Sequence, residues 1–385
     1  MDSGNRQAAV GEGKLKKLAK IAELAKAKVT PLDYLHKKDR GKLNIGWCSY
    51  FPPSENGVAA ATYSIANALN KMAGFSVYAI PADGLIDRSL FPNMKVAKID
   101  DKELDAVIFF CLGEKTINFV EKSKSKNFVW QTVHEPPLTD KSEKQIFEQL
   151  KKFENVFLVS KWATKEYNKA GVKAKYLPIA VDINKFVPRR NESFEVLFVS
   201  RIHHFKGVIT FLKTIPHVLR NHSHVKFRLH APIDRFSPHL HEILSEIEKA
   251  KKAYPNNFLF EESWIDYDEM PKKYANSSVL VFPSASEGFG VPLIEAMSCG
   301  IPCIVADKKP MNEIIENNKT GFCLPQRERI HDHFFPSAEE ISEKINYLFE
   351  NKSVFEKMQR NARQKAEKEY SRDAVLEKLV KELSK

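Results

Sequence analysis

The sequence predicts an α/β protein of two doubly wound, Rossmann-like domains that face a cleft, with an extra basic helix at the N-terminus. The chain has 385 residues, which is long for a single hydrophobic core. From Leu43 onward, short apolar runs alternate with helical patterns, and a second series of the same kind begins at Phe194. Such alternation is typical of parallel sheets covered by helices on both faces, and their ligands bind beyond the carboxyl ends of the strands.

The first domain is predicted over residues 43–187. Its expected strands are Leu43–Cys48, Ser76–Pro81, Ala106–Cys111, Asn127–Val133, Val156–Ser160 and Lys175–Pro178. Its expected helices are Ala59–Lys71, Lys115–Ser123 and Lys161–Ala170.

The second domain is predicted over residues 188–365. Its expected strands are Phe194–Ser200, Val225–Ala231, Phe258–Glu261, 279–282 and 303–306, and its expected helices are Val208–Arg220, Pro238–Ala253, 269–276 and 292–299. Charge-rich helical segments follow from residue 338, and residues 366–385 are predicted as a helix that crosses back to the first domain. No Gly-x-Gly-x-x-Gly follows the first strand of either domain, which argues against a nicotinamide dehydrogenase.

The composition indicates a soluble globular protein, because 43% of the residues are hydrophobic and 28% are charged. No run approaches the roughly 18 apolar residues that a membrane-spanning helix needs, and the N-terminus lacks the pattern of a secretory signal. The five cysteines are odd in number and mostly lie in apolar patterns, which suits buried thiols and a cytoplasmic protein.

The basic charge is concentrated in an N-terminal arm, residues 1–42. The formal net charge is +11, and the arm holds eleven Lys/Arg against five Asp/Glu, so that +6 lies in the arm and +5 in the rest. Because no basic run is interleaved with aromatic residues, nucleic-acid binding is not expected.

The sequence predicts a moderately amphipathic helix over residues 14–28 of the arm. One interpretation is that residues 14–29 rest on an anionic membrane surface, which would make the protein peripheral on the inner face of the membrane. The alternative is a solvated helix or a partly disordered arm.

The most informative motif is a pair of acids on either side of a glycine turn. Glu287 precedes Gly288 and Gly290, and Glu295 lies within one turn of the start of a helix that begins near Pro292. Glycines let backbone amides approach a ligand closely, and a helix N-terminus favours phosphate. The motif therefore fits a diphosphate flanked by hydroxyl-rich groups, as in a nucleotide sugar. The alternative is two solvated surface charges.

Cations and a histidine follow other predicted strands. Arg201 and Lys206 lie in the loop after the first strand of the second domain, where they could clamp a diphosphate. His134 follows strand Asn127–Val133, and Asn56-Gly57 precedes the first helix. Each has a plainer interpretation as a surface charge, a turn cap or a simple turn.

In these residues the chain resembles the GT4 family of GT-B glycosyltransferases, which transfer sugars from nucleotide donors with retention of anomeric configuration. The resemblance covers about residues 43–370. It rests on an ordered set of matches: Pro53 with Asn56-Gly57, His134, 177–186, Arg201 with Lys206-Gly207, 282–284, Glu287 with Glu295, 312–315 and Thr320-Gly321.

The resemblance implies a role for each matched residue. Arg201 and Lys206 would hold the donor diphosphate, Glu295 the ribose, and His134 the sugar near its reacting carbon. Glu287 would contact the donor sugar together with the amides of Gly288 to Gly290. The implied donor site comprises Arg201, Lys206, Glu287, Gly288, Phe289, Gly290, Val291, Pro292, Leu293 and Glu295. The reaction would need no metal, no cofactor and no general-base carboxylate, and the acceptor would be a sugar, a glycan or a lipid-linked group.

Two departures from the family pattern leave alternatives open. Asn56-Gly57, the candidate acceptor or phosphate loop, stands where the family usually has paired glycines, and Ala180 stands where a glycine is frequent. One alternative is a catalytically inactive nucleotide-sugar-binding protein of the same fold. Another is a nucleic-acid binder that acts through the basic arm.

Overall fold

The computed structural model describes residues 42–51, 57–87, 91, 93–101, 103–112, 114–120, 122–134, 141–189, 193–263 and 269–384. The basic helix predicted over residues 14–28 and Asn56 therefore lie outside the described residues. The chain divides into two compact units. One comprises residues 1–131, 144–157 and 171–174, and the other comprises residues 132–143, 158–170 and 175–385.

The first sheet has seven strands in the order β3-β2-β1-β4-β5-β6-β7. Its strands are β1 (Leu43–Ser49), β2 (Phe75–Pro81), β3 (Lys95–Val96), β4 (Ala106–Phe110), β5 (Lys126–Gln131), β6 (Asn155–Leu158) and β7 (Ala174–Tyr176). The described registers are parallel, with Ile45 opposite both Val77 and Ala106. The helices in this part of the chain are α2 (Gly57–Lys71), α3 (Glu114–Val120), α4 (Lys141–Leu150) and α5 (Lys161–Lys169).

The second sheet has six strands in the order β10-β9-β8-β11-β12-β13. They are β8 (Glu195–Val199), β9 (Lys226–His230), β10 (Phe258–Glu261), β11 (Val279–Phe282), β12 (Cys303–Ala306) and β13 (Gly321–Leu324). Counted from β8, this is the 3-2-1-4-5-6 order of a dinucleotide-type doubly wound sheet. All five strand pairs are parallel, so their carboxyl ends lie at one edge.

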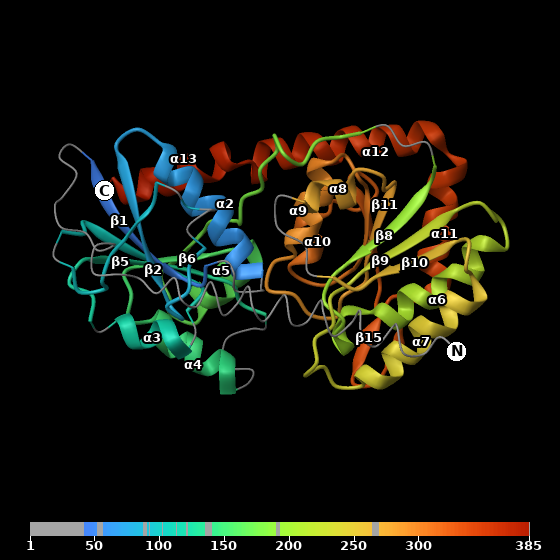
Figure 1. Cartoon of the computed structure of the whole chain (residues 1–385), viewed down its shortest axis with the longest axis horizontal. Coiled ribbons are helices and arrows are strands. Elements are labelled where there is room, and N and C mark those ends of the chain that lie inside the picture. The colour runs from blue at the N-terminus through green and yellow to red at the C-terminus, as the bar shows by residue number, and fades with distance from the viewer. Residues whose placement is uncertain are drawn as a thin grey trace, which may run out of the picture. The chain divides into compact units, whose positions relative to one another are not determined.

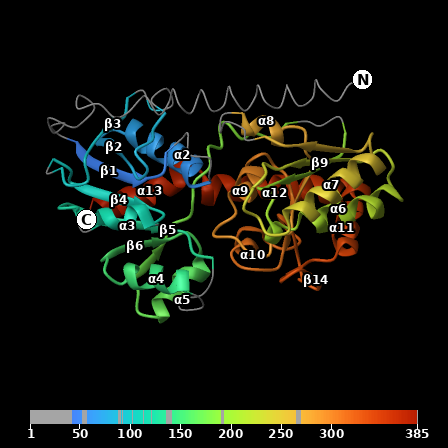
Figure 2. The same ribbon diagram turned by 60° about the horizontal axis from the view of Figure 1, so that its bottom comes forward.

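Helices cover the second sheet on both faces (Figures 1 and 2). Helices α6 (Val208–Leu219), α7 (Leu240–Ala253) and α11 (Ala338–Glu350) pack together along one face. The short helix α9 (Val291–Ser298) contacts β11 and β12 and is joined by α8 (Met270–Tyr274), α10 (Met311–Ile314) and α12 (Lys352–Lys365). A hairpin of β14 (Glu328–Ile330) and β15 (His333–Phe335) precedes α11.

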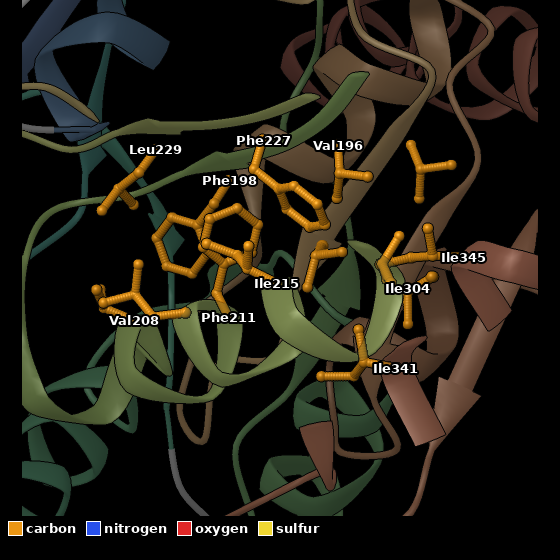
Figure 3. Packing of buried hydrophobic residues seen from close by; sticks show 14 of the residues in the cluster. Val196, Phe198, Val208, Phe211, Ile215, Phe227, Leu229, Ile304, Ile341 and Ile345 are labelled. Atoms are coloured by element: carbon orange, nitrogen blue, oxygen red, sulfur yellow. The ribbon is translucent and has the colours of Figure 1, made fainter. Parts of the chain in front are cut away.

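The core of the second sheet is built where α6 meets the strands. Figure 3 shows Val208, Phe211 and Ile215 of α6 directed toward Phe198 and Phe227 of the sheet. All five are at most 1% exposed. Burying side chains of this size contributes about 1.5–3 kcal/mol each, so this layer stabilises the packing of α6 on β8 and β9.

Every strand and helix that the sequence predicted in residues 43–306 is confirmed, with ends shifted by a few residues at most. The short strand β3, helices α4 and α10, strand β13 and the β14–β15 hairpin were not predicted. The C-terminal helical region is confirmed as α11, α12, a π-helical turn (Ala366–Tyr370) and α13 (Arg372–Leu383). Among the described residues, no helix is long and apolar enough to span a bilayer.

The C-terminal helices are tied to the base of α9 by one arginine. Nη1 of Arg363, in α12, donates to the carbonyl oxygens of Ile183 at 3.1 Å, Phe186 at 2.8 Å and Ser298 at 2.6 Å. Ser298 is the last residue of α9, so the guanidinium satisfies a carbonyl that a helix C-terminus leaves unpaired. Nε of the same side chain donates to Glu367.

Arg363→Met is expected to lower the free energy of unfolding by about 2–4 kcal/mol, because it leaves several part-buried carbonyls without a donor. The change is measured as a shift of the urea midpoint at unchanged slope. Arg360→Met, at an exposed position of the same helix, is the matched control and should change stability by less than about 0.5 kcal/mol. Equal effects from the two substitutions would contradict this assignment.

Candidate functional site

The second sheet has its topological switch point between β8 and β11. The chain continues from β8 toward β9 and β10 on one side and from β11 toward β12 and β13 on the other. In such sheets the crevice outside the carboxyl ends of these two strands is the usual ligand site. The loop after β8 carries Arg201 and Lys206, and the loop after β11 carries Glu287. The three charged residues predicted from the sequence therefore follow the two strands that flank the switch point.

The two loops are held against each other by short contacts. The amide of Ala285 donates to the carbonyl of Phe205 at 2.8 Å, and the Ser284 hydroxyl lies 3.3 Å from the same carbonyl oxygen. Gly207 has φ +78°, and a Cβ there would lie 2.8 Å from the Pro283 ring. Glycine is therefore required at position 207 both by its backbone conformation and by the close packing.

Lys206 and Glu287 form a buried ion pair. Nζ of Lys206 lies 2.6 Å from Oε1 of Glu287, and each side chain is only 10% exposed. The ammonium also lies over the ring of Phe205, 4.9 Å from its centroid. Burying two charges costs several kcal/mol per ion, which close pairing only partly repays. A buried pair at a switch point is therefore better explained by ligand binding than by stability.

The glycine turn leads directly into α9. Gly290 has φ +104° and is the residue before the helix, which begins at Val291, one residue earlier than the sequence predicted. Val291 and Pro292 are half-buried, whereas the ring of Phe289 and the side chain of Leu293 are buried. The amide of Leu293 donates to the carbonyl of Gly290 at 3.0 Å.

His134 lies beside this turn. A Cβ on Gly288 would be 2.9 Å from Nε2 of His134 and 3.1 Å from Cβ of Thr132. Residues 132–143 belong to the same compact unit as Gly288. The structure thus brings together two residues that are more than 150 positions apart in the sequence, and the missing side chain at position 288 is what allows the imidazole to approach.

Glu295 lies deeper than the sequence indicated. It is 4% exposed and accepts a hydrogen bond of 2.7 Å from the hydroxyl of Tyr274. Burial raises the pKa of Glu295 to about 7, although the bond from Tyr274 opposes the shift. Burial also raises the pKa of Tyr274 well above its ordinary value. Glu295 is therefore a hydrogen-bonding group close to its protonation midpoint at neutral pH.

Arg201 lies at the outer edge of the site. Its side chain is 48% exposed, and Nη1 lies 3.0 Å from Oδ2 of Asp234, which follows β9. Neither Asp234 nor Tyr274 was predicted from the sequence. Asp234 could have been predicted from the sequence, because it follows the carboxyl end of a parallel strand next to β8. Nothing in the sequence indicates Tyr274, because its hydrogen bond to Glu295 depends on how α8 packs against α9.

Of the predicted Asn56-Gly57 turn, Gly57 is described and is the first residue of α2.

Residues 181–368 match the family model described as glycosyl transferases group 1. The matched segment is just under half of the chain and contains Arg201, Lys206, Asp234, Glu287 and Glu295, but not His134. The two parallel-sheet α/β domains are those of the GT-B fold.

The chain is similar to known proteins at low identity. It is 22% identical to spore coat protein SA of Bacillus subtilis, over 85% of this chain and 95% of that protein. It is 23% identical to the D-inositol 3-phosphate glycosyltransferase of Paenarthrobacter aurescens, over 38% of each chain, so it spans well under half of that relative. The structure of Anabaena HepE in complex with UDP and glucose aligns with a TM-score of 0.69 at 15% identity, covering 89% of this chain and 99% of HepE.

Proposed function

We propose that the protein is a GT4-type retaining glycosyltransferase that moves a sugar from a nucleoside diphosphate sugar to an acceptor hydroxyl. One observation carries the proposal: a buried ion pair, Lys206–Glu287, lies at the switch point of the second sheet beside a glycine turn and a helix N-terminus. This arrangement offers a cation and a helix start to a diphosphate, and a carboxylate to sugar hydroxyls.

The diphosphate is assigned to Lys206 and Arg201. The ammonium of Lys206 is held in place by Glu287, and the guanidinium of Arg201 by Asp234. Negative charge grows on the diphosphate as it leaves the sugar, and fixed cations in a buried site stabilise that charge more than water does. These two side chains supply the charge that a divalent cation would otherwise supply, so we propose a metal-independent reaction.

The sugar and ribose are assigned to the two glutamates and His134. Glu287 and the backbone of Gly288–Gly290 contact the donor sugar, and the imidazole of His134 faces the same turn. Glu295 binds the ribose. Its pKa near 7 lets it act as acceptor or donor toward hydroxyls at neutral pH. HepE, a structure of similar fold, was solved in complex with UDP and glucose, which supports a nucleotide-sugar donor.

We propose that the acceptor oxygen attacks the anomeric carbon from the same face from which the diphosphate leaves, so that the anomeric configuration is retained. The acceptor oxygen bonds to the anomeric carbon, the bond to the phosphate oxygen breaks, and the acceptor proton moves to that phosphate oxygen. Both acids of the site are already engaged, Glu287 by Lys206 and Glu295 by Tyr274. Neither is therefore assigned as nucleophile or general base.

The experiment is a donor screen followed by product analysis. UDP-, GDP- and ADP-sugars are compared by thermal shift, and the best donor is then followed by NMR during transfer or slow hydrolysis. An α-linked donor should give the α anomer as the first product. The β anomer as first product would disprove retention. Binding with neither transfer nor hydrolysis would favour the alternative of an inactive nucleotide-sugar-binding protein.

For the N-terminal arm we propose contact with an anionic membrane surface through residues 14–29, which would bring the enzyme to a lipid-linked acceptor. The proposal rests on the amphipathic basic pattern in the sequence. In sedimentation with vesicles containing phosphatidylserine, deletion of residues 1–29 should abolish binding, and added salt should weaken it. Unchanged sedimentation of the deletion variant would exclude this role.

A further inference from the structure

Five histidines gather beside the loop that carries Lys206. His203 and His204 come from that loop, His239 precedes α7, and His331 and His333 come from the β14–β15 hairpin. The ring of His204 lies 4.9 Å from that of His333 and 6.1 Å from that of His239. Imidazole is the commonest metal-binding side chain of proteins, so this cluster offers several ligand atoms to a cation.

Three side chains in the cluster have the spacing of metal ligands. Three ligand atoms lie within 4.8 Å of one another, one each from His239, Glu242 and His331. Nε2 of His331 is 2.8 Å from Oε2 of Glu242, and the rings of His239 and His331 stack with centroids 3.7 Å apart and planes 6° apart. Two imidazoles and a carboxylate from two separate elements therefore lie within reach of one ion, and the exposed ring of His239 must turn out of the stack to point a nitrogen at it.

The protein does not use the full bonding capacity of these rings. His239 occupies the position before α7, where a side chain normally caps the helix, yet it makes no capping hydrogen bond. The buried Nδ1 atoms of His204 and His331 have no hydrogen-bond partner among the described residues. Buried ring nitrogens without partners are uncommon in native proteins and indicate a missing ligand or ion.

We propose that His239, Glu242 and His331 form a binding site for a transition-metal cation of the Zn²⁺ class. Two imidazoles and one carboxylate suit Zn²⁺, Ni²⁺ or Cu²⁺ rather than Mg²⁺ or Ca²⁺, which prefer oxygen. With ligand bonds of about 2.0–2.2 Å, tetrahedral ligands lie roughly 3.4 Å apart. Nε2 of His331 and Oε2 of Glu242, now 2.8 Å apart, must therefore separate slightly, and ligand atoms more than 3.4 Å apart must approach, which the exposed His239 and Glu242 are free to do. A water molecule completes the shell.

A cation in this site would link the N-terminus of α7 to the turn between β14 and β15. The hairpin in turn contacts the loop of Lys206, because His333 packs against both His204 and Phe205. The site is therefore structural. It steadies the surroundings of the loop, and no step of sugar transfer depends on it.

The test is calorimetric titration of ZnCl₂ into the full-length, untagged protein, together with thermal unfolding with and without Zn²⁺. We expect one equivalent to bind and the melting temperature to rise. His239→Ala with His331→Ala, and separately Glu242→Gln, should weaken binding by about tenfold or more, since loss of even an outer-shell partner costs about 10- to 100-fold. MgCl₂ should neither bind at this site nor raise the melting temperature.

The control is His222→Ala, which removes another histidine–glutamate pair, with Nε2 of His222 3.0 Å from Oε1 of Glu350. This variant should bind Zn²⁺ like the wild type. A Co²⁺ spectrum without thiolate charge-transfer bands would exclude the cysteines as ligands. If the double variant, folded and with normal metal-free stability, binds Zn²⁺ as the wild type does, or if the wild type binds none, the proposal is wrong.

Discussion

Lys206→Met is expected to lower the rate of sugar transfer by about 10²- to 10³-fold, the range found when one group that stabilises transition-state charge is removed. The ammonium lies at the switch point and is fixed 2.6 Å from Glu287, so it is already oriented before charge develops on the leaving diphosphate. Methionine keeps the apolar contacts of the lysine stem and loses only the charge. The rate is measured under saturating donor and compared with wild type.

The same substitution also affects folding, and a second variant separates the two effects. Lys206→Met leaves the buried carboxylate of Glu287 without its partner, which is expected to cost about 3–5 kcal/mol of stability. Combining it with Glu287→Gln removes the orphaned charge and should recover most of that loss. Transfer by the double variant should nevertheless stay low. Recovery of transfer together with stability would show that Lys206 is only structural.

Glu295→Gln is expected to change how stability depends on pH. Burial raises the pKa of Glu295 from 4.5 to about 7 in the folded protein. Below pH 4.5 the carboxyl is protonated in both states and imposes no penalty. Between pH 4.5 and 7 the unfolded chain loses the proton first, so wild-type stability falls as pH rises, and above pH 7 the penalty is constant at up to about 3 kcal/mol.

Glutamine does not ionise, so the stability difference between Glu295→Gln and wild type should grow from pH 4.5 to 7 in favour of the variant. It is measured by urea unfolding at several pH values. Tyr274→Phe is the opposing control, because the tyrosine hydroxyl lowers the pKa of Glu295, and its loss should raise that pKa further and extend the fall in stability to higher pH. A difference that does not vary with pH would mean that Glu295 titrates normally. The gain in stability should come with weaker donor binding.

The sequence predicted the parts of the molecule that local patterns determine. Apolar strands such as Val279–Phe282 and the glycine turn with its proline-started helix appeared where expected, because strand burial and helix starts are encoded within a few residues. Lys206 and Glu287 were placed near each other by one rule, that parallel strands end at the same edge of a sheet.

Other features depend on contacts that no local pattern records. The pairing of Glu295 with Tyr274 arises from the packing of α8 on α9. The hydrogen bonds of Arg363 join segments about 180 positions apart in the sequence. The strands β14 and β15 have only three residues each, too few to show a periodic pattern, and were missed. The histidine cluster could likewise not be predicted from the sequence, because its members are spread from position 203 to position 333 in three elements.

The most direct test is calorimetric binding of the nucleoside diphosphate that the donor screen selects. Wild type is compared with the Lys206→Met, Glu287→Gln double variant at a pH where both are fully folded. The proposed site predicts one equivalent bound by wild type and an affinity at least about tenfold lower, equivalent to 1.4 kcal/mol, for the variant. Equal affinities would show that the diphosphate does not bind between the loops that follow β8 and β11.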